Sequence, residues 1–249
     1  MMDDVGVLAG DFSDQKGQKL QKIIVAIDGP AAAGKSSAAS GLARRLGVPY
    51  LDSGSLYRGI AWKVLDQKIS PDQQGAVERL CQFVKIEPRL YDNATRILVD
   101  GEDVTSYLRH PEVTRGAAII SAFAGVRKRL LSTQREIGGQ MGVVMEGRDI
   151  GSVVFPDADM KFYLDASLKV RAMRRFSELQ SQAVATDVAT TLREIQTRDL
   201  MDSQREIAPL KRGEDSVTID SSDITLDEVI GRMMEEIGKR LKVFRKLPP

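Results

Sequence analysis

Residues 29–36 read Gly29-Pro30-Ala31-Ala32-Ala33-Gly34-Lys35-Ser36, and this stretch decides the fold. It satisfies the pattern G-x-x-x-x-G-K-[ST] in full. The β-branched run 23–27 comes directly before it, and residues 34–46 follow with apolar positions at helical spacing. A strand, a glycine-bounded turn and a helix in this order begin a βα unit, so the sequence predicts an α/β protein.

The glycine-bounded turn is expected to bind phosphate. Successive backbone N–H groups in such a loop converge on phosphate oxygens, and the N-terminus of the following helix adds partial positive charge. Lys35 is expected to reach the β- and γ-phosphates of ATP, and Ser36 to offer its hydroxyl to Mg²⁺. The alternative is a turn that only tightens strand–helix packing. The residues expected to hold ATP are Gly29, Pro30, Ala31, Ala32, Ala33, Gly34, Lys35, Ser36 and Ser37.

Composition limits the class of protein. The chain has 249 residues, 42% hydrophobic and 29% charged, which suits one large globular domain with a small insertion. Lys and Arg number 36 and Asp and Glu 35, so the charge is not that of a nucleic-acid-binding protein. A single Cys81 excludes an internal disulfide, and with only one histidine it excludes a Cys/His zinc cluster. The lone cysteine, with no signal-peptide core and no long apolar run, predicts a cytoplasmic protein without a membrane partner. We also expect a monomer, and no nucleic-acid partner.

The remaining apolar runs predict the rest of the architecture. Short runs at 48–51, 143–145, 160–164 and 217–220 are separated by helix-like segments, which is typical of a parallel sheet of about five strands. Residues 84–86 and 97–99 predict a small antiparallel meander. Long helices are expected at 56–66, 112–137, 168–182, 188–205 and 226–241. Together with the motif at 29–36, these predict a P-loop fold with flanking helices and a small β-rich insertion.

Several arginines stand where they could clamp a second phosphate. Arg58 follows the expected strand 48–51, and Arg148 follows the strand at 143–145. Arg198 and Arg205 lie seven residues apart on one expected helix, with Asp202 between them, which favours a mobile lid. Phosphoryl transfer between two phosphates gathers negative charge that fixed guanidinium groups offset. Each arginine alone also suits a surface salt bridge.

From about residue 22 onwards the chain resembles the bacterial cytidylate kinases. The resemblance rests on specific stretches outside the phosphate-binding turn as well as within it. The matching residues are Ile27-Asp28-Gly29-Pro30, Leu51-Asp52-Ser53-Gly54 with Tyr57-Arg58, Gly147-Arg148-Asp149-Ile150-Gly151, Val154-Phe155-Pro156-Asp157-Ala158, Arg198-Asp199 and Ala208-Pro209-Leu210.

The resemblance implies transfer of the γ-phosphoryl group of ATP to CMP or dCMP, with Mg²⁺. It also implies a role for each matched position. Ser53, Arg58, Arg148 and Arg205 would hold the CMP phosphate. Arg198 and Asp202 would contact the pentose, and Arg127 and Asp149 would read the cytosine edge. The catalytic residues would be Lys35, Arg58, Arg148, Arg198 and Arg205.

Domain boundaries follow from the same resemblance and from composition. A kinase domain is expected over 22–242, between a disordered tail at 1–21 and a second tail at 243–249. Within it the core would comprise 22–69, 110–180 and 211–242, the acceptor-binding insertion 70–109 and the lid 181–210.

Three positions depart from the family pattern, and two rival functions stay open. Ala32 stands where glycine is common, Gly125 where proline is frequent, and Ala118 where serine often helps to contact the base. A kinase for another acceptor, such as UMP or shikimate, is one rival. A P-loop module that binds nucleotide without transferring phosphate is the other.

Overall fold

The computed structural model describes residues 22–91 and 94–244, which divide into two compact units. The first unit contains the described residues 22–23 and 43–143, and the second contains 24–42 and 144–244. The expected tail 1–21 and residues 245–249 of the second tail lie outside the described residues. No helix formed by the described residues is both long enough and apolar enough to cross a membrane.

Five strands form the predicted parallel sheet, in the order β2-β6-β1-β7-β8. Their bounds are β1 (Ile24–Asp28), β2 (Tyr50–Asp52), β6 (Val143–Gly147), β7 (Met160–Asp165) and β8 (Val217–Asp220). Val25 lies opposite Met160 in the β1–β7 pair, and Phe162 lies opposite Val217 in the β7–β8 pair. Strand β6 is buried throughout, as expected of a strand covered on both faces. Each strand lies at a run predicted from the sequence, which confirms the fold class.

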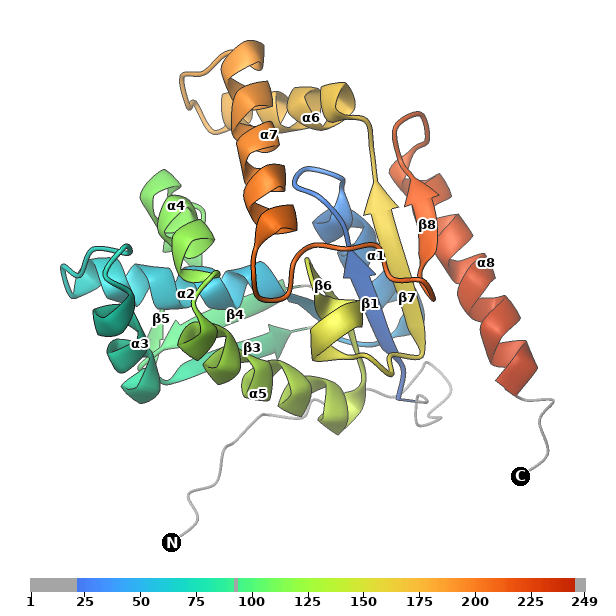
Figure 1. The fold of residues 1–249 in the computed structure, drawn as a ribbon. Helices are drawn as coiled ribbons and strands as arrows, with labels where there is room; N and C mark the ends of the chain where they lie inside the picture. The colour runs from blue at the N-terminus through green and yellow to red at the C-terminus, as the bar shows by residue number, and fades with distance from the viewer. Residues whose placement is uncertain (1–21, 92–93, 245–249) are drawn as a thin grey trace, which may run out of the picture. The chain divides into compact units, whose positions relative to one another are not determined.

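Helices of the second unit follow the expected pattern (Figure 1). They are α1 (Lys35–Leu46), which begins in this unit, α6 (Leu168–Ser181), α7 (Val188–Gln204) and α8 (Leu226–Phe244). Side-chain caps fix two of their starts, because Ser167 Oγ accepts from the N–H of Val170 and Asp187 Oδ1 accepts from that of Thr190. One element was not predicted, a π-helical turn over Ile150–Val154.

The first unit is built around α2 (Ser53–Asp66). A three-stranded antiparallel sheet packs on this helix and confirms the predicted meander; its strands are β3 (Ile86–Tyr91), β4 (Ala94–Val99) and β5 (Glu102–Asp103). Gly59 makes the close approach possible, since a Cβ there would lie 2.9 Å from Ile86 Cδ1 and 3.1 Å from Ile97 Cγ2. The sequence did not predict α3 (Gln74–Phe83) or the short 3₁₀ turn Thr105–Tyr107.

The single helix expected over 112–137 is wrong. Two helices occupy the region, α4 (Pro111–Ile120) and α5 (Ala124–Met141). Phe123 between them is extended, with φ −80° and ψ 127°, and the Arg127 guanidinium donates to Ser121 O over 3.0 Å. No proline or glycine marks residues 121–123, so the break depends on contacts that the local pattern does not reveal.

The start of the phosphate-binding turn requires glycine. Gly29 has φ +150°, and a Cβ added there would lie 2.0 Å from the carbonyl oxygen of Leu164 on β7. That oxygen belongs to the backbone of a central strand and cannot move aside easily. The turn therefore lies directly against the sheet because its first residue has no side chain.

We expect Gly29→Ala to destabilise the protein by ~3 kcal/mol or more, because steric overlap with Leu164 adds to backbone strain. Gly139→Ala is the matched control: it lies within α5 with no heavy atom within 4 Å of the added Cβ, and should stabilise by about 0.5–1 kcal/mol. Denaturant unfolding measures both. Equal stabilities for the two variants would contradict the close approach.

Candidate active site

The phosphate-binding turn keeps a left-handed geometry at two residues. Gly34, with φ +89°, precedes α1, and Ala32 has φ +59°. Glycine adopts such a φ without strain, whereas an alanine there costs on the order of 1–2 kcal/mol. This explains why Ala32 is an uncommon choice at its position. Ser36 and Ser37 follow, exposed, on the first turn of α1.

Lys35 is buried beside this turn. Its side chain is 5% exposed, and Nζ donates to Pro30 O over 2.7 Å. Burial lowers the pKa of Lys35 from 10.5 to about 7, and the neighbouring Arg148 and Arg198 add to the effect. Glu146 and Asp202 oppose it. Several cations thus converge on the turn, which is the electrostatic arrangement of an anion site.

Ser36 contacts a carboxylate at the end of the neighbouring strand. Its Oγ donates to Glu146 Oε1 over 2.7 Å, and Glu146 is buried near the end of β6. Hydroxyl and carboxylate oxygens are ligands that Mg²⁺ prefers, and Mg²⁺ commonly uses one or two protein oxygens together with waters and substrate phosphates. The pair therefore fits the expected metal site, although no cluster of three or more His, Cys, Asp or Glu residues suited to a metal occurs in 22–91 and 94–244.

Asp28, the last residue of β1, fixes the segment that carries Arg148 and Asp149. Its carboxylate accepts from the backbone N–H groups of Ile150 and Gly151, over 2.8 and 2.7 Å. Burial raises the pKa of Asp28 to about 6, although the two backbone hydrogen bonds favour the charged form. The carboxylate caps the π-helical turn and ties it to the strand that leads into the phosphate-binding turn.

Arg148 is held by Asp202 of α7. Arg148 Nε donates to Asp202 Oδ2 over 2.7 Å, and Nη1 of Arg205 lies 3.9 Å from the other oxygen. Burial alone would raise the pKa of Asp202, but Arg148, Arg198 and Arg205 outweigh it and hold the pKa below its ordinary value. One carboxylate thus neutralises several of the predicted phosphate-binding arginines.

Arg205 does not lie on the lid helix as expected. Helix α7 ends at Gln204, and Arg205 is extended, with φ −55° and ψ 136°. Its Nη2 donates to Ala208 O over 3.0 Å, while Leu210 N donates to Asp202 O. These bonds turn the chain back on itself, so Arg198 and Arg205 are not two positions on one helical face.

In the first unit, the predicted phosphate ligand Arg58 is paired with Asp52. Its Nη2 lies 2.5 Å from Asp52 Oδ2, and its Nε is buried without a hydrogen-bond partner among the described residues. Gly54 leaves room for this pair, since a Cβ there would lie 2.9 Å from Arg58 Nη1. Ser53, buried, begins α2 next to them. A buried, unsatisfied guanidinium nitrogen is suited to an incoming anion.

The two residues expected to read the base are both buried. The Arg127 guanidinium lies 5.8 Å from the centre of the Tyr57 ring and donates to Ser121 O. Asp149 belongs to the second unit, where it precedes the π-helical turn. Their shared contact with a base stays a prediction.

One of the departures from the family pattern has a local explanation. Gly125 N donates to Glu78 Oε1 over 2.9 Å, a bond that a proline could not form. Nothing in the structure explains Ala118.

The structure thus brings together Lys35, Ser36, Arg148 and Asp202 with their partners in the second unit, and Ser53 and Arg58 in the first. Sequence reasoning assigned no role to Asp28, Arg171 and Asp199. Asp28 and Asp199 lie in stretches that resemble the cytidylate kinases. For Asp28, an acidic residue directly after an apolar strand could also have indicated a role at the turn. Nothing in the local sequence singles out Arg171.

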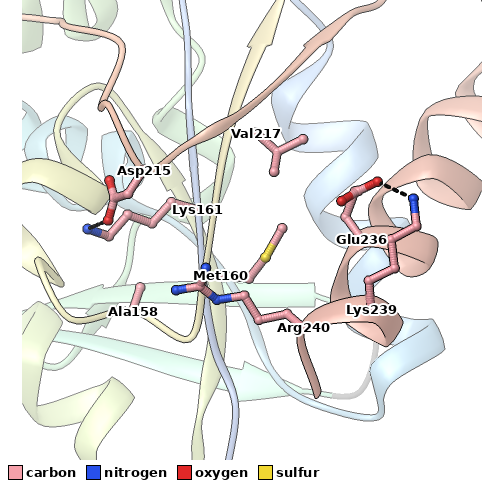
Figure 2. A pocket seen from close by; sticks show the side chains of 8 residues that line it. All are labelled: Ala158, Met160, Lys161, Asp215, Val217, Glu236, Lys239 and Arg240. Atoms are coloured by element: carbon pink, nitrogen blue, oxygen red, sulfur yellow. Dashed lines mark hydrogen bonds and ion pairs between the residues drawn. The ribbon is translucent and has the colours of Figure 1, made fainter. Parts of the chain in front are cut away.

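A cavity of about 250 Å³ lies elsewhere, between β7, β8 and α8 (Figure 2). Met160 and Val217, which begin their strands, line it, so it lies at the amino edge of the sheet, opposite the phosphate-binding turn. Its lysines are paired: Lys161 lies 2.6 Å from Asp215, and Lys239 lies 2.7 Å from Glu236. The cavity is therefore separate from the candidate active site.

Comparison with known proteins finds one family over most of the chain. A family model described as cytidylate kinase matches residues 25–239. A cytidylate kinase from Geobacillus sp. (strain WCH70) is 40% identical over 219 residues, covering 88% of this chain and 98% of that protein. One from Caldicellulosiruptor bescii is 41% identical over 223 residues, covering 90% and 99%. A bifunctional pantoate ligase/cytidylate kinase from Synechocystis sp. is 44% identical over 215 residues, which are 85% of this chain and 42% of that protein.

The buried Asp28 predicts a pH dependence of stability. Its pKa is about 6 in the folded chain and near 3.8 when exposed, so the folded chain binds this proton more readily. Stability should therefore fall as the pH rises from about 4 to about 6, by on the order of 3 kcal/mol from this group. Asp28→Asn removes this titrating group. The loss in unfolding free energy caused by Asp28→Asn should therefore be greater at about pH 4 than at about pH 7, by on the order of 3 kcal/mol.

Urea unfolding across this pH range measures the effect, with Asp157→Asn at an exposed position as the control. The same cost for Asp28→Asn at both pH values would show that the folded-state pKa is not raised.

Proposed function

Since this chain belongs to the cytidylate kinase family, we propose that it transfers the γ-phosphoryl group of ATP to CMP or dCMP, giving ADP and CDP or dCDP. The observation that carries the proposal is the geometry of the turn 29–36, where Lys35 Nζ donates to Pro30 O and Ser36 Oγ donates to Glu146, with Arg148 near Lys35. We further propose that it acts as a cytoplasmic monomer on small-molecule substrates.

The donor is ATP, held by residues 29–37. Apart from Ala31, whose N–H donates to Asp199, backbone N–H groups of the turn and the N-terminus of α1 would bind its phosphates. Lys35 is a point charge for the β- and γ-phosphates, and its lowered pKa favours exchange of the Pro30 carbonyl for an anionic partner. Ser36 and Glu146 would hold Mg²⁺, which neutralises charge on the transferring group when bound.

The acceptor phosphate is held by Ser53, Arg58, Arg148 and Arg205 in this proposal. The buried Nε of Arg58 supports its part, and the ion pairs that Arg148 and Arg205 form with Asp202 support theirs. Guanidinium groups suit this task because they contact phosphate oxygens in pairs. The pentose is assigned to Arg198 and Asp202.

Cytosine is assigned to Arg127 and Asp149. A carboxylate can accept a hydrogen bond from the exocyclic amine of cytosine, and an arginine can donate to the ring carbonyl. Uracil lacks the amine, so a site built this way discriminates against UMP. The burial of both side chains supports the assignment, because hydrogen bonds away from water discriminate most strongly.

Chemistry at this site requires no side-chain base. The second pKa of a phosphate monoester is about 6, so the attacking oxygen of CMP is largely ionised at neutral pH. The protein therefore positions the two phosphates in line and offsets their repulsion. No covalent intermediate forms on the enzyme.

Acceptor screening tests the function directly. ADP release with CMP, dCMP, UMP and shikimate, measured in a coupled assay, should be fastest with CMP or dCMP. Faster ADP release with UMP or shikimate would show that the protein is a kinase for that acceptor instead of CMP. ATP binding without ADP release for any acceptor would favour a non-catalytic nucleotide-binding module.

We expect Lys35→Ala to lower kcat by about 10²-fold or more, because a charge aimed at the transferring phosphate is lost. The melting temperature of the variant should not fall. A lowered pKa means that the buried ammonium group of Lys35 destabilises the fold at pH values below 10.5, so removing it relieves that cost. Lys239→Ala, which removes an exposed lysine, should keep full activity. Parallel loss of melting temperature and activity in Lys35→Ala would assign the residue to folding instead.

Asp149→Asn and Arg148→Lys should have different effects on the preference for CMP over UMP. Asp149→Asn should weaken CMP use by about 1–3 kcal/mol and narrow the CMP-to-UMP ratio of kcat/KM, because an amide also donates to the uracil carbonyl. Arg148→Lys should lower kcat/KM by the same factor for CMP and UMP, because lysine cannot reproduce a paired contact with phosphate. Steady-state kinetics with both nucleotides measures this. Equal losses for CMP and UMP in Asp149→Asn would remove Asp149 from base recognition.

A further inference from the structure

We infer that Arg171 and Asp199 are positioning residues that fasten α7 to the phosphate-binding turn at Ala31. The inference rests on the proposed kinase function, because it concerns how Arg198 and Asp202 of α7 are held in place for phosphoryl transfer. Neither Arg171 nor Asp199 is assigned here to substrate contact.

Arg171 joins three parts of the second unit. Its Nε donates to Ala166 O over 2.9 Å, just after β7. Its Nη1 donates to Ala31 O over 3.1 Å, and the same nitrogen lies 2.5 Å from Asp199 Oδ2. The Arg171 side chain is buried, and the rigid guanidinium plane fixes the relative positions of its acceptors. A lysine has only one nitrogen and could not join all three.

Asp199 completes the connection from α7. While Oδ2 binds Arg171, Oδ1 accepts from the backbone N–H of Ala31 over 3.3 Å. Both backbone groups of Ala31 are therefore engaged by the Arg171–Asp199 pair. Ala31 lies in the turn that begins at Gly29, so any movement of α7 is transmitted to the turn itself.

Two carboxylates three residues apart on α7 have different partners. Asp202 pairs with Arg148, a residue proposed to bind phosphate, so a substrate phosphate competes with that ion pair. Asp199 pairs with Arg171, whose remaining hydrogen bonds go to backbone carbonyls and need not break when substrate binds. The Arg171–Asp199 pair is thus the permanent attachment, and the Arg148–Asp202 pair is the exchangeable one.

Arg171 is buried and Asp199 partly buried, so removing one partner leaves an uncompensated charge away from water. Loss of the attachment should therefore misplace Arg198 and Asp202 relative to the turn. Misplacement by about 1 Å can cost on the order of 10²-fold in rate. The effect should appear in kcat and in local backbone protection of the turn.

The test compares Asp199→Ala, Asp199→Asn, Arg171→Lys and the double variant Asp199→Ala with Arg171→Lys. Glu194→Ala, which removes an exposed carboxylate from the same helix, is the control. Kinetics are measured well below the melting temperature of every variant, and backbone hydrogen exchange is followed for 29–36 and for the strands β7 and β8.

Asp199→Ala and Arg171→Lys should each lower kcat about 10- to 100-fold and speed exchange in 29–36 while β7 and β8 stay protected. Asp199→Asn should fall between Asp199→Ala and the wild type, because its amide oxygen still accepts from Ala31. The double variant should be no worse than the poorer single variant, since the residues act as one unit.

Unchanged kcat with only a lower melting temperature, faster exchange in all segments, or additive losses in the double variant would overturn the inference. If the wild type and Glu194→Ala release no ADP with CMP, the proposed function has failed. In that case hydrogen exchange by itself tests whether Arg171 and Asp199 attach α7 to the turn. Loss of protection confined to 29–36 supports the attachment, and uniform or no change refutes it.

Discussion

Positive charge crowded beside the phosphate-binding turn is the constraint on which the rest of the second unit depends. Lys35, Arg148 and Arg198 lie close enough that each arginine lowers the pKa of the lysine. Such repulsion is tolerable only with carboxylates nearby or with anions bound. The carboxylates come from β6, with Glu146, and from α7, with Asp202, which is ion-paired with Arg148.

Asp202 would have a second task under the proposed function. It occupies the Arg148 environment that a substrate phosphate would fill, so substrate binding would exchange one anion for another. The electrostatic cost of gathering the cations is met during folding, and the substrates meet dipoles and charges that are already oriented. Catalysis by charge neutralisation requires such an arrangement, because the reaction itself offers the protein little covalent chemistry.

Local signals predicted most of the fold. The strands of the parallel sheet and the turn at 29–36 were found because apolar runs and a glycine-bounded motif are properties of neighbouring residues. The break between α4 and α5 was missed, because Arg127 and Ser121 hold it together without a turn residue. Arg171 was missed because its partners are up to 140 positions away in sequence. The insertion at 70–109, the lid at 181–210 and the substrate roles stay predictions.

Ala32 has a consequence for the behaviour of the turn before nucleotide arrives. A glycine at this position would explore both signs of φ, whereas an alanine has only a narrow left-handed basin besides its ordinary right-handed and extended ones. Substituting glycine by alanine therefore removes backbone entropy from every competing shape of the loop. The alanine turn therefore has fewer competing shapes than a glycine turn would have, so it exchanges some backbone strain for a smaller loss of backbone entropy on binding a ligand.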